Sequence, residues 1–127
     1  MRQLKITKGV LSEKEAAFEK YLKEIHQEKS ITIKEEVKLA QQVKNGDEEA
    51  FEKLKAVNNR YITIIAKHYK KEDGDLSDLI DSGNEGLKKA AEMFDETRKF
   101  SFISYATWWI KTSISQTIAE KHHQEKS

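Results

Sequence analysis

The chain has 127 residues, 35% of them charged, and its 23 basic and 22 acidic side chains give a formal net charge of +1. This balance excludes tight nonspecific binding to duplex DNA through bulk charge, so any nucleic-acid contact has to be local. The absence of cysteine excludes disulfides and thiolate metal sites, and no apolar run is long enough for a membrane span or a signal peptide. We therefore expect a soluble, cytoplasmic protein.

Capping signals predict the first two helices. Ser12 precedes Glu15 at the spacing of a capping box, and apolar residues then recur every three or four positions. Thr32 and Glu35 repeat this signal before a second amphipathic stretch. Gly46 follows that stretch and can adopt the left-handed conformation that closes a helix.

Three further helices are expected after this turn. Asp47 can cap a long helix that carries the central core stripe towards Lys70, and Asp75 or Ser77 can cap a fourth helix. A fifth is expected from Ser104 to Ile118. Without strand alternation or internal repeats, the predicted fold is all-α, a single bundle of about five helices. We divide the chain into an N-terminal helical segment (1–30), a bundle (31–120) and a flexible tail (121–127).

Two glycines lie inside the fourth predicted helix, at Gly83 and Gly86. Each costs about 1 kcal/mol relative to alanine at an exposed helical position. We therefore expect other helices to pack closely against both of them.

The fifth predicted helix has two contrasting faces. A turn of 100° per residue sets an aliphatic stripe on one side and an aromatic stripe nearly opposite. The first consists of Ile103, Ile110, Ile114 and Ile118, and the second of Tyr105, Trp108, Trp109, Thr112 and Gln116. The aliphatic stripe can anchor the helix to a core.

Large aromatic rings in water are unusual in a chain with a mean hydropathy of −0.79. Unstacked bases could cover them, because aromatic stacking contributes ~1–3 kcal/mol per base. Arg98, Lys99 and Lys111 lie near enough in the sequence to neutralise phosphates. The alternative is a helix buried on both sides, with its aromatic residues in the core.

The fourth predicted helix has a strongly polar outer face. It comprises Asp78, Asp81, Glu85, Lys88 and Glu92, with Asn84 at its edge. Such a face is usually only solvated, but it could dock a basic partner helix.

The sequence carries no catalytic pattern. The four histidines lack metal-ligand spacing, and neither a phosphate-binding loop nor a nucleophile elbow is present. We expect no enzyme activity, no cofactor, no metal site, no small-molecule substrate and no membrane partner.

A family resemblance rests on two stretches of the chain. The segment DLIDSGNEGLKKAAEMFDETRKFSFISYATWWIKTSISQTIAE resembles the second region of the primary-type sigma factors of bacterial RNA polymerase, the sigma-seventy family. The upstream segment YLKEIHQEKSITIKEEVKLAQQVKNGDEEAFEKLKAVNNRYI resembles the helices that precede that region. The resemblance implies a bundle that binds the clamp coiled coil of core RNA polymerase. It also implies capture of the melted non-template strand of the promoter −10 element.

The resemblance assigns residues to both tasks. The polymerase-binding positions are Asp78, Asp81, Asn84 and Lys88. The site for a flipped adenine is lined by Phe94, Arg98, Ser104, Tyr105, Trp108 and Trp109, and shaped by Phe100 and Phe102. Trp108 and Trp109 are expected to form a wedge that replaces the displaced base. With Lys99, Lys111, Thr112 and Gln116 these residues form the predicted DNA-binding set.

The chain departs from the family pattern on both surfaces. On the DNA side, Lys99 replaces a glycine, Thr112 a glutamine, and Ser101 and Gln116 basic residues. On the polymerase side, Asp81 replaces a glutamine, Ser82 a glutamate and Lys88 an apolar residue.

The sequence ends about where family members continue into a linker and a helix-turn-helix that reads the −35 element. We expect either a fragment of a longer factor or a natural short relative. The departures and this ending leave an alternative function, a regulator or decoy that occupies the polymerase clamp without productive promoter recognition.

Overall fold

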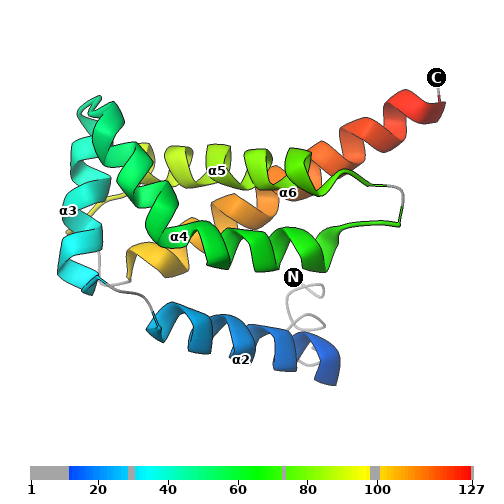
Figure 1. Ribbon diagram of the computed structural model, residues 1–127, viewed down its shortest axis with the longest axis horizontal. Helices are drawn as coiled ribbons and strands as arrows, with labels where there is room; N and C mark the ends of the chain where they lie inside the picture. Colours follow the sequence, from blue (N-terminus) through cyan, green and yellow to red (C-terminus); the bar gives the residue numbers. More distant parts are fainter. Residues whose placement is uncertain (1–11, 29–30, 73, 98–100, 127) are drawn as a thin grey trace, which may run out of the picture.

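The computed structural model describes residues 12–28, 31–72, 74–97 and 101–126, and these ranges form five α-helices without a strand (Figure 1). The helices are α2 (Glu13–Gln27), α3 (Ile33–Lys44), α4 (Glu48–Tyr69), α5 (Leu76–Met93) and α6 (Phe102–Lys126). The predicted all-α bundle is confirmed. None of these helices is both long and apolar enough to cross a membrane.

The predicted caps start the helices as expected. Ser12 accepts a hydrogen bond from the Glu15 amide at 3.1 Å. Thr32 and Glu35 form a complete capping box, with bonds of 3.0 and 2.8 Å. Hydrogen bonds from Thr32 hold the pKa of the Glu35 carboxyl below its ordinary value. Of the two candidates for α5, it is Asp75 that caps the helix, accepting from the Ser77 amide at 2.9 Å.

The turn between α3 and α4 follows from Gly46. This residue has φ of +90°, and its amide donates to the Val43 carbonyl at 2.9 Å. The Asp47 amide donates to the Gln42 carbonyl at 3.0 Å, which completes a Schellman motif. Asp47 then caps α4 by accepting from the Ala50 amide at 3.0 Å. The chain therefore reverses into α4 almost at once.

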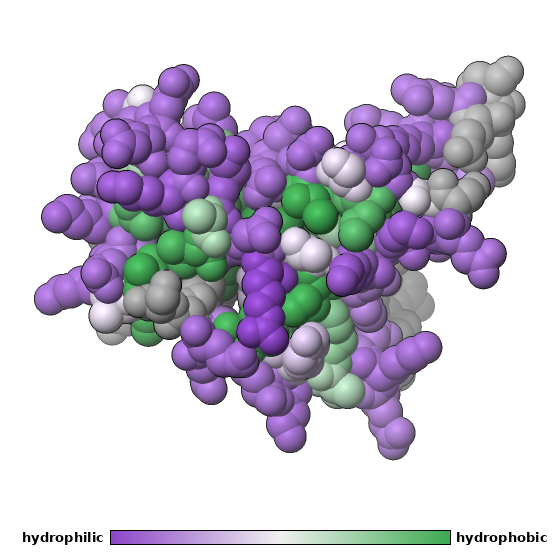
Figure 2. Space-filling view, viewed as in Figure 1, coloured by the Kyte–Doolittle hydropathy of each residue, from purple (hydrophilic) through white to green (hydrophobic). Residues whose placement is uncertain are grey.

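The core lies where α4, α5 and α6 meet. Its fully buried aliphatic side chains come from all three helices and include Leu54, Ile62, Ile65, Leu87, Ile110 and Ile114. On the face in Figure 2, hydrophilic residues cover most of the surface and hydrophobic residues show through near the middle. The aliphatic stripe of α6 is buried at Ile103, Ile110 and Ile114, and Ile118 is half-buried.

Both glycines of α5 mark close approaches, as predicted. A Cβ atom at Gly83 would lie 2.6 Å from Cγ2 of Ile62 in α4. At Gly86 it would lie 2.6 Å from the Trp109 carbonyl oxygen and 2.9 Å from Cα of Ile110. The backbone of α6 is thus in direct contact with α5. This contact sets the position of α6 along α5 and its rotation about its own axis, and so the direction in which the aromatic stripe faces.

The two ends of the described chain differ in how they pack. Helix α2 buries Leu22 and Ile25 against the bundle and stacks Phe18 on His68 of α4, with ring centroids 3.7 Å apart. Helix α6 continues beyond its expected end at Ile118 and extends past α5 (Figure 1). The segment expected as a tail is therefore helical through Lys126.

Candidate nucleic-acid interface

One side of α6 is fixed in the core, and this orients the rest of the helix. Phe102, Ala106 and Ile110 are at most 1% exposed. Trp108, half a turn away from Ala106 and Ile110, is 62% exposed. Its ring is one of the few large apolar groups that the described bundle leaves open to solvent.

A series of aromatic contacts connects this exposed ring to the core. Phe102 meets Phe94 at 5.2 Å between centroids, and Phe94 meets Tyr105 at 5.7 Å. Tyr105 meets Trp109 at 6.4 Å, and Trp109 meets Trp108 at 5.3 Å with the rings nearly perpendicular. Edge contacts of this kind hold the rings in defined orientations. The series therefore connects the exposed Trp108 ring to the core through Trp109, Tyr105 and Phe94.

The structure places three of the expected site residues further inside than the sequence suggested. Phe94 is 3% and Phe102 1% exposed, so both support the site from beneath. Trp109 is half-buried and packs against the core, although we expected it to face outward. Successive residues on a helix point about 100° apart, so Trp108 and Trp109 cannot both point directly outward.

The Trp109 indole has an unusual feature. Its Nε1 donor is buried and has no hydrogen-bond partner among the described residues. A buried donor without a partner costs about 1–3 kcal/mol. A position that gave this N–H group an acceptor would therefore be more favourable for its hydrogen bonding.

The remaining polar residues of the predicted set are distributed along the same helix. Ser104 and Gln116 are exposed, and Tyr105 and Thr112 are half-buried. Arg98, Lys99 and Phe100 lie outside the described residues.

Ser101 has a role that the sequence analysis missed. Its hydroxyl accepts from the Ser104 amide at 3.3 Å and lies 2.8 Å from the Ser104 hydroxyl. Ser101 therefore caps the start of α6. A serine three residues before Ser104 was the available signal.

Lys111 is engaged by α2. Its ammonium group forms an ion pair with Glu19, a contact that joins two helices far apart in the sequence. Close by, a hollow of about 320 Å³ lies between α2 and the first turns of α6. It is lined by residues that include Glu19, His26, Ser101, Ser104 and Thr107. Glu19 and Ser104 line the same hollow, so Glu19 is an acidic neighbour of the predicted DNA-binding residues.

Tyr61 joins α4 to α6 beneath this surface. Its hydroxyl lies 2.8 Å from that of Thr107. Burial raises the pKa of Tyr61, because desolvation disfavours the phenolate. The phenol is neutral at ordinary pH and serves to hold the helices together.

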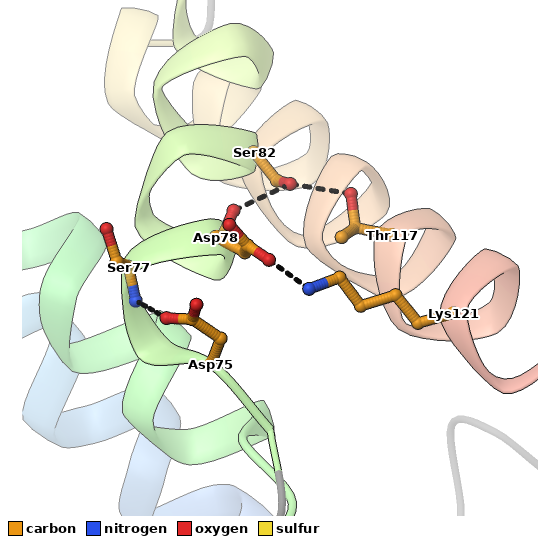
Figure 3. Close-up of polar contacts among 6 residues, drawn as sticks. All are labelled: Asp75, Ser77, Asp78, Ser82, Thr117 and Lys121. Carbon is orange, nitrogen blue, oxygen red and sulfur yellow. Dashed lines mark hydrogen bonds and ion pairs between the residues drawn. The ribbon is translucent and has the colours of Figure 1, made fainter. Parts of the chain in front are cut away.

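The four predicted polymerase-binding residues lie along α5 with different surroundings. Asp81 and Lys88 are exposed, whereas Asp78 and Asn84 are half-buried. The Lys88 ammonium lies 5.6 Å from the centroid of the Phe51 ring. Asp78 forms an ion pair with Lys121 of α6 (Figure 3). Asp81 is therefore the most accessible acid of this set.

Comparison with known proteins gives consistent matches. The family model described as Sigma-70 region 2 matches residues 57–123, and that described as Sigma-70 factor, region 1.2, matches residues 17–49. Two curated relatives are both named RNA polymerase sigma factor SigA. The one from a Bacillus species is 45% identical and the one from Clostridium acetobutylicum 46% identical, each over 101 residues. These alignments cover 80% of this chain and 27% of each relative, so the chain spans about a quarter of their length.

Proposed function

The chain belongs to the sigma-70 family, and from this premise we propose that it binds core RNA polymerase and captures the non-template single strand of the promoter −10 element. The proposed action is binding, not catalysis. The observation that carries the DNA half is the 62% exposure of Trp108 at the outer end of the aromatic series.

Strand capture on this surface needs no chemical energy. A base that opens spontaneously can stack on the Trp108 ring, which gains ~1–3 kcal/mol. The Trp108 ring already faces solvent in the free chain, so it does not have to be uncovered before a base arrives. Ser104 and Tyr105 lie close enough on α6 to make polar contacts with the edge of an extruded base.

We propose that the Trp109 side chain changes its orientation when the strand binds. Rotation of its ring towards solvent would give the buried indole N–H access to an acceptor from water or from the nucleotide. In that position Trp109 would lie beside Trp108 and fill the place of the displaced base. We propose the half-buried ring as the state of the free chain and the outward ring as the bound state.

Charge contributes less to this proposed binding than stacking. The formal net charge is only +1, and Ser101 and Gln116 are uncharged where family members carry basic residues. Lys111, the described cation nearest the aromatic series in sequence, is paired with Glu19. We expect modest affinity for an isolated single strand, with a shallow dependence on salt.

The polymerase half of the proposal rests on the outer face of α5. Asp81 and Glu85 are exposed one turn apart, and charge complementarity favours a basic partner. The proposed partner is the clamp coiled coil of core polymerase. Purified core polymerase should bind the chain, and replacement of Asp81 by asparagine should weaken that binding.

A second candidate function is a regulator or decoy that occupies the clamp without reading a promoter. It is favoured by the internal pairing of Lys111 and by the uncharged Ser101 and Gln116. Joining the chain to a promoter-reading carboxyl-terminal domain distinguishes the two. Support of initiation argues for the first function, and inhibition alone for the second.

The DNA half is tested by tryptophan fluorescence. Trp108 and Trp109 are the chain's two tryptophans, so the signal reports directly on the proposed surface. We expect quenching by a single strand containing TATAAT and weaker quenching by a scrambled strand. Equal or absent quenching by both would refute promoter-strand capture.

A further inference from the structure

Polar contacts join the start of α5 to the far half of α6 (Figure 3). The Asp78 carboxylate forms an ion pair with the Lys121 ammonium group. One turn along α5, the Ser82 hydroxyl donates to the Asp78 carbonyl at 3.0 Å and lies 2.5 Å from Thr117 Oγ1. Since Ser82 has only one hydroxyl proton, Thr117 is the donor in the second bond. Asp78 and Ser82 are thus both turned towards α6.

This arrangement changes the charge of the proposed polymerase face. Ser82 stands where the family resemblance implies a glutamate, and it is 8% exposed. The Asp78 charge is neutralised by a cation from the same chain. A basic partner approaching α5 therefore meets less negative charge at this end than the number of acidic residues suggests.

The ion pair remains open to exchange. The Asp78 and Lys121 side chains are 46% and 43% exposed, so a partner can reach the carboxylate. None of residues 119–124 of α6 is buried, and a hollow of about 650 Å³ lies between this part of α6 and the start of α5. Release of Lys121 would therefore not disturb the core.

We propose that Lys121 is an internal competitor for the polymerase: it occupies the Asp78 carboxylate in the free chain and is displaced when a basic side chain of the partner binds there. This inference rests on the proposed polymerase binding. A partner cation that gains Asp78 must replace an existing ion pair, so the net gain from that contact is small. Without Lys121 the same carboxylate would be available at full charge.

The test measures the affinity of purified core RNA polymerase for the full 127-residue chain and its variants by fluorescence anisotropy. Lys121→Gln should bind about two- to fivefold more tightly than the unaltered chain. Fivefold corresponds to about 1 kcal/mol, the upper range for a partly exposed pair. Lys121→Arg preserves the pair and should bind like the unaltered chain.

Two controls separate this effect from a general change in charge. Lys38 is exposed on α3, and Lys38→Gln removes the same charge without touching Asp78. It should not reproduce the gain. In an Asp78→Asn background, Lys121→Gln should have no effect on affinity, because the contested carboxylate is gone. Thermal unfolding of each variant checks that the bundle remains folded.

The outcomes are distinct. Equal or weaker binding of Lys121→Gln, or an equal gain from Lys38→Gln, overturns the inference and leaves the proposed function standing. A gain that persists in the Asp78→Asn background also overturns it. If neither the unaltered chain nor any variant binds polymerase, the proposed function fails and the inference fails with it. A gain for Lys121→Gln that neither Lys121→Arg nor Lys38→Gln shows, and that is absent in the Asp78→Asn background, supports the inference.

Discussion

Replacing Glu19 by glutamine should strengthen single-strand binding. The Glu19 carboxylate pairs with Lys111, and their side chains are 44% and 25% exposed. A pair of this exposure contributes up to about 1 kcal/mol, so freeing Lys111 should tighten binding by at most about fivefold. If Lys111 then neutralises one further phosphate, the slope of log K against log salt should steepen by about 0.7.

The assay is anisotropy of a labelled TATAAT strand over a range of salt concentrations. Glu24→Gln is the matched control, because Glu24 is exposed on the same helix and the charge change is identical. In a Lys111→Gln background the gain should disappear. Equal effects of Glu19→Gln and Glu24→Gln, or an unchanged salt slope, would refute the view that the ion pair with Glu19 keeps Lys111 from binding a phosphate.

Three further predictions concern the packing that supports the surface. Gly86→Ala should destabilise the bundle by about 1 kcal/mol or more in urea unfolding, because overpacking against the α6 backbone outweighs the gain in helix propensity; a stabilised variant would contradict the close approach. Trp109→Ala should cost about 2 kcal/mol, since a half-buried ring loses less than the ~3–5 kcal/mol of a fully buried one; an unchanged unfolding midpoint would mean that the ring is not packed. The pKa of Tyr61 is raised in the folded chain, so its contribution to stability is present below about pH 10 and is lost as the pH rises through the pKa of the folded state. Tyr61→Phe should therefore lose less stability than the unaltered chain over that pH range. An identical loss in both would exclude Tyr61 as the source of the pH dependence.

Features that depend on neighbouring residues could be predicted from the sequence. The caps at Ser12, Thr32 and Asp47 need only a side chain and the amide three residues later. The end of α3 could be predicted because it depends only on the left-handed backbone conformation of Gly46 itself. Gly83 and Gly86 were informative because their cost in a helix demanded a close neighbour, although the neighbour itself could not be named.

Features that depend on the approach of distant helices could not be predicted. Glu19 and Lys111 are 92 residues apart, and Asp78 and Lys121 are 43 apart. Helical spacing placed Trp109 in a stripe with Trp108, but the packing of α6 on α5 decides which ring is covered. The helical end of α6 was missed, yet residues 119–127 contain neither glycine nor proline to stop a helix.

The central claim is that the exposed Trp108 ring receives a base of the promoter strand. The most direct measurement is the affinity of Trp108→Ala for the labelled TATAAT strand, compared with the unaltered chain and with a scrambled strand. We predict a loss of about fivefold to a hundredfold for TATAAT, which corresponds to ~1–3 kcal/mol of lost stacking, with little change in unfolding because the ring is 62% exposed. Unchanged affinity in a folded variant would contradict the account.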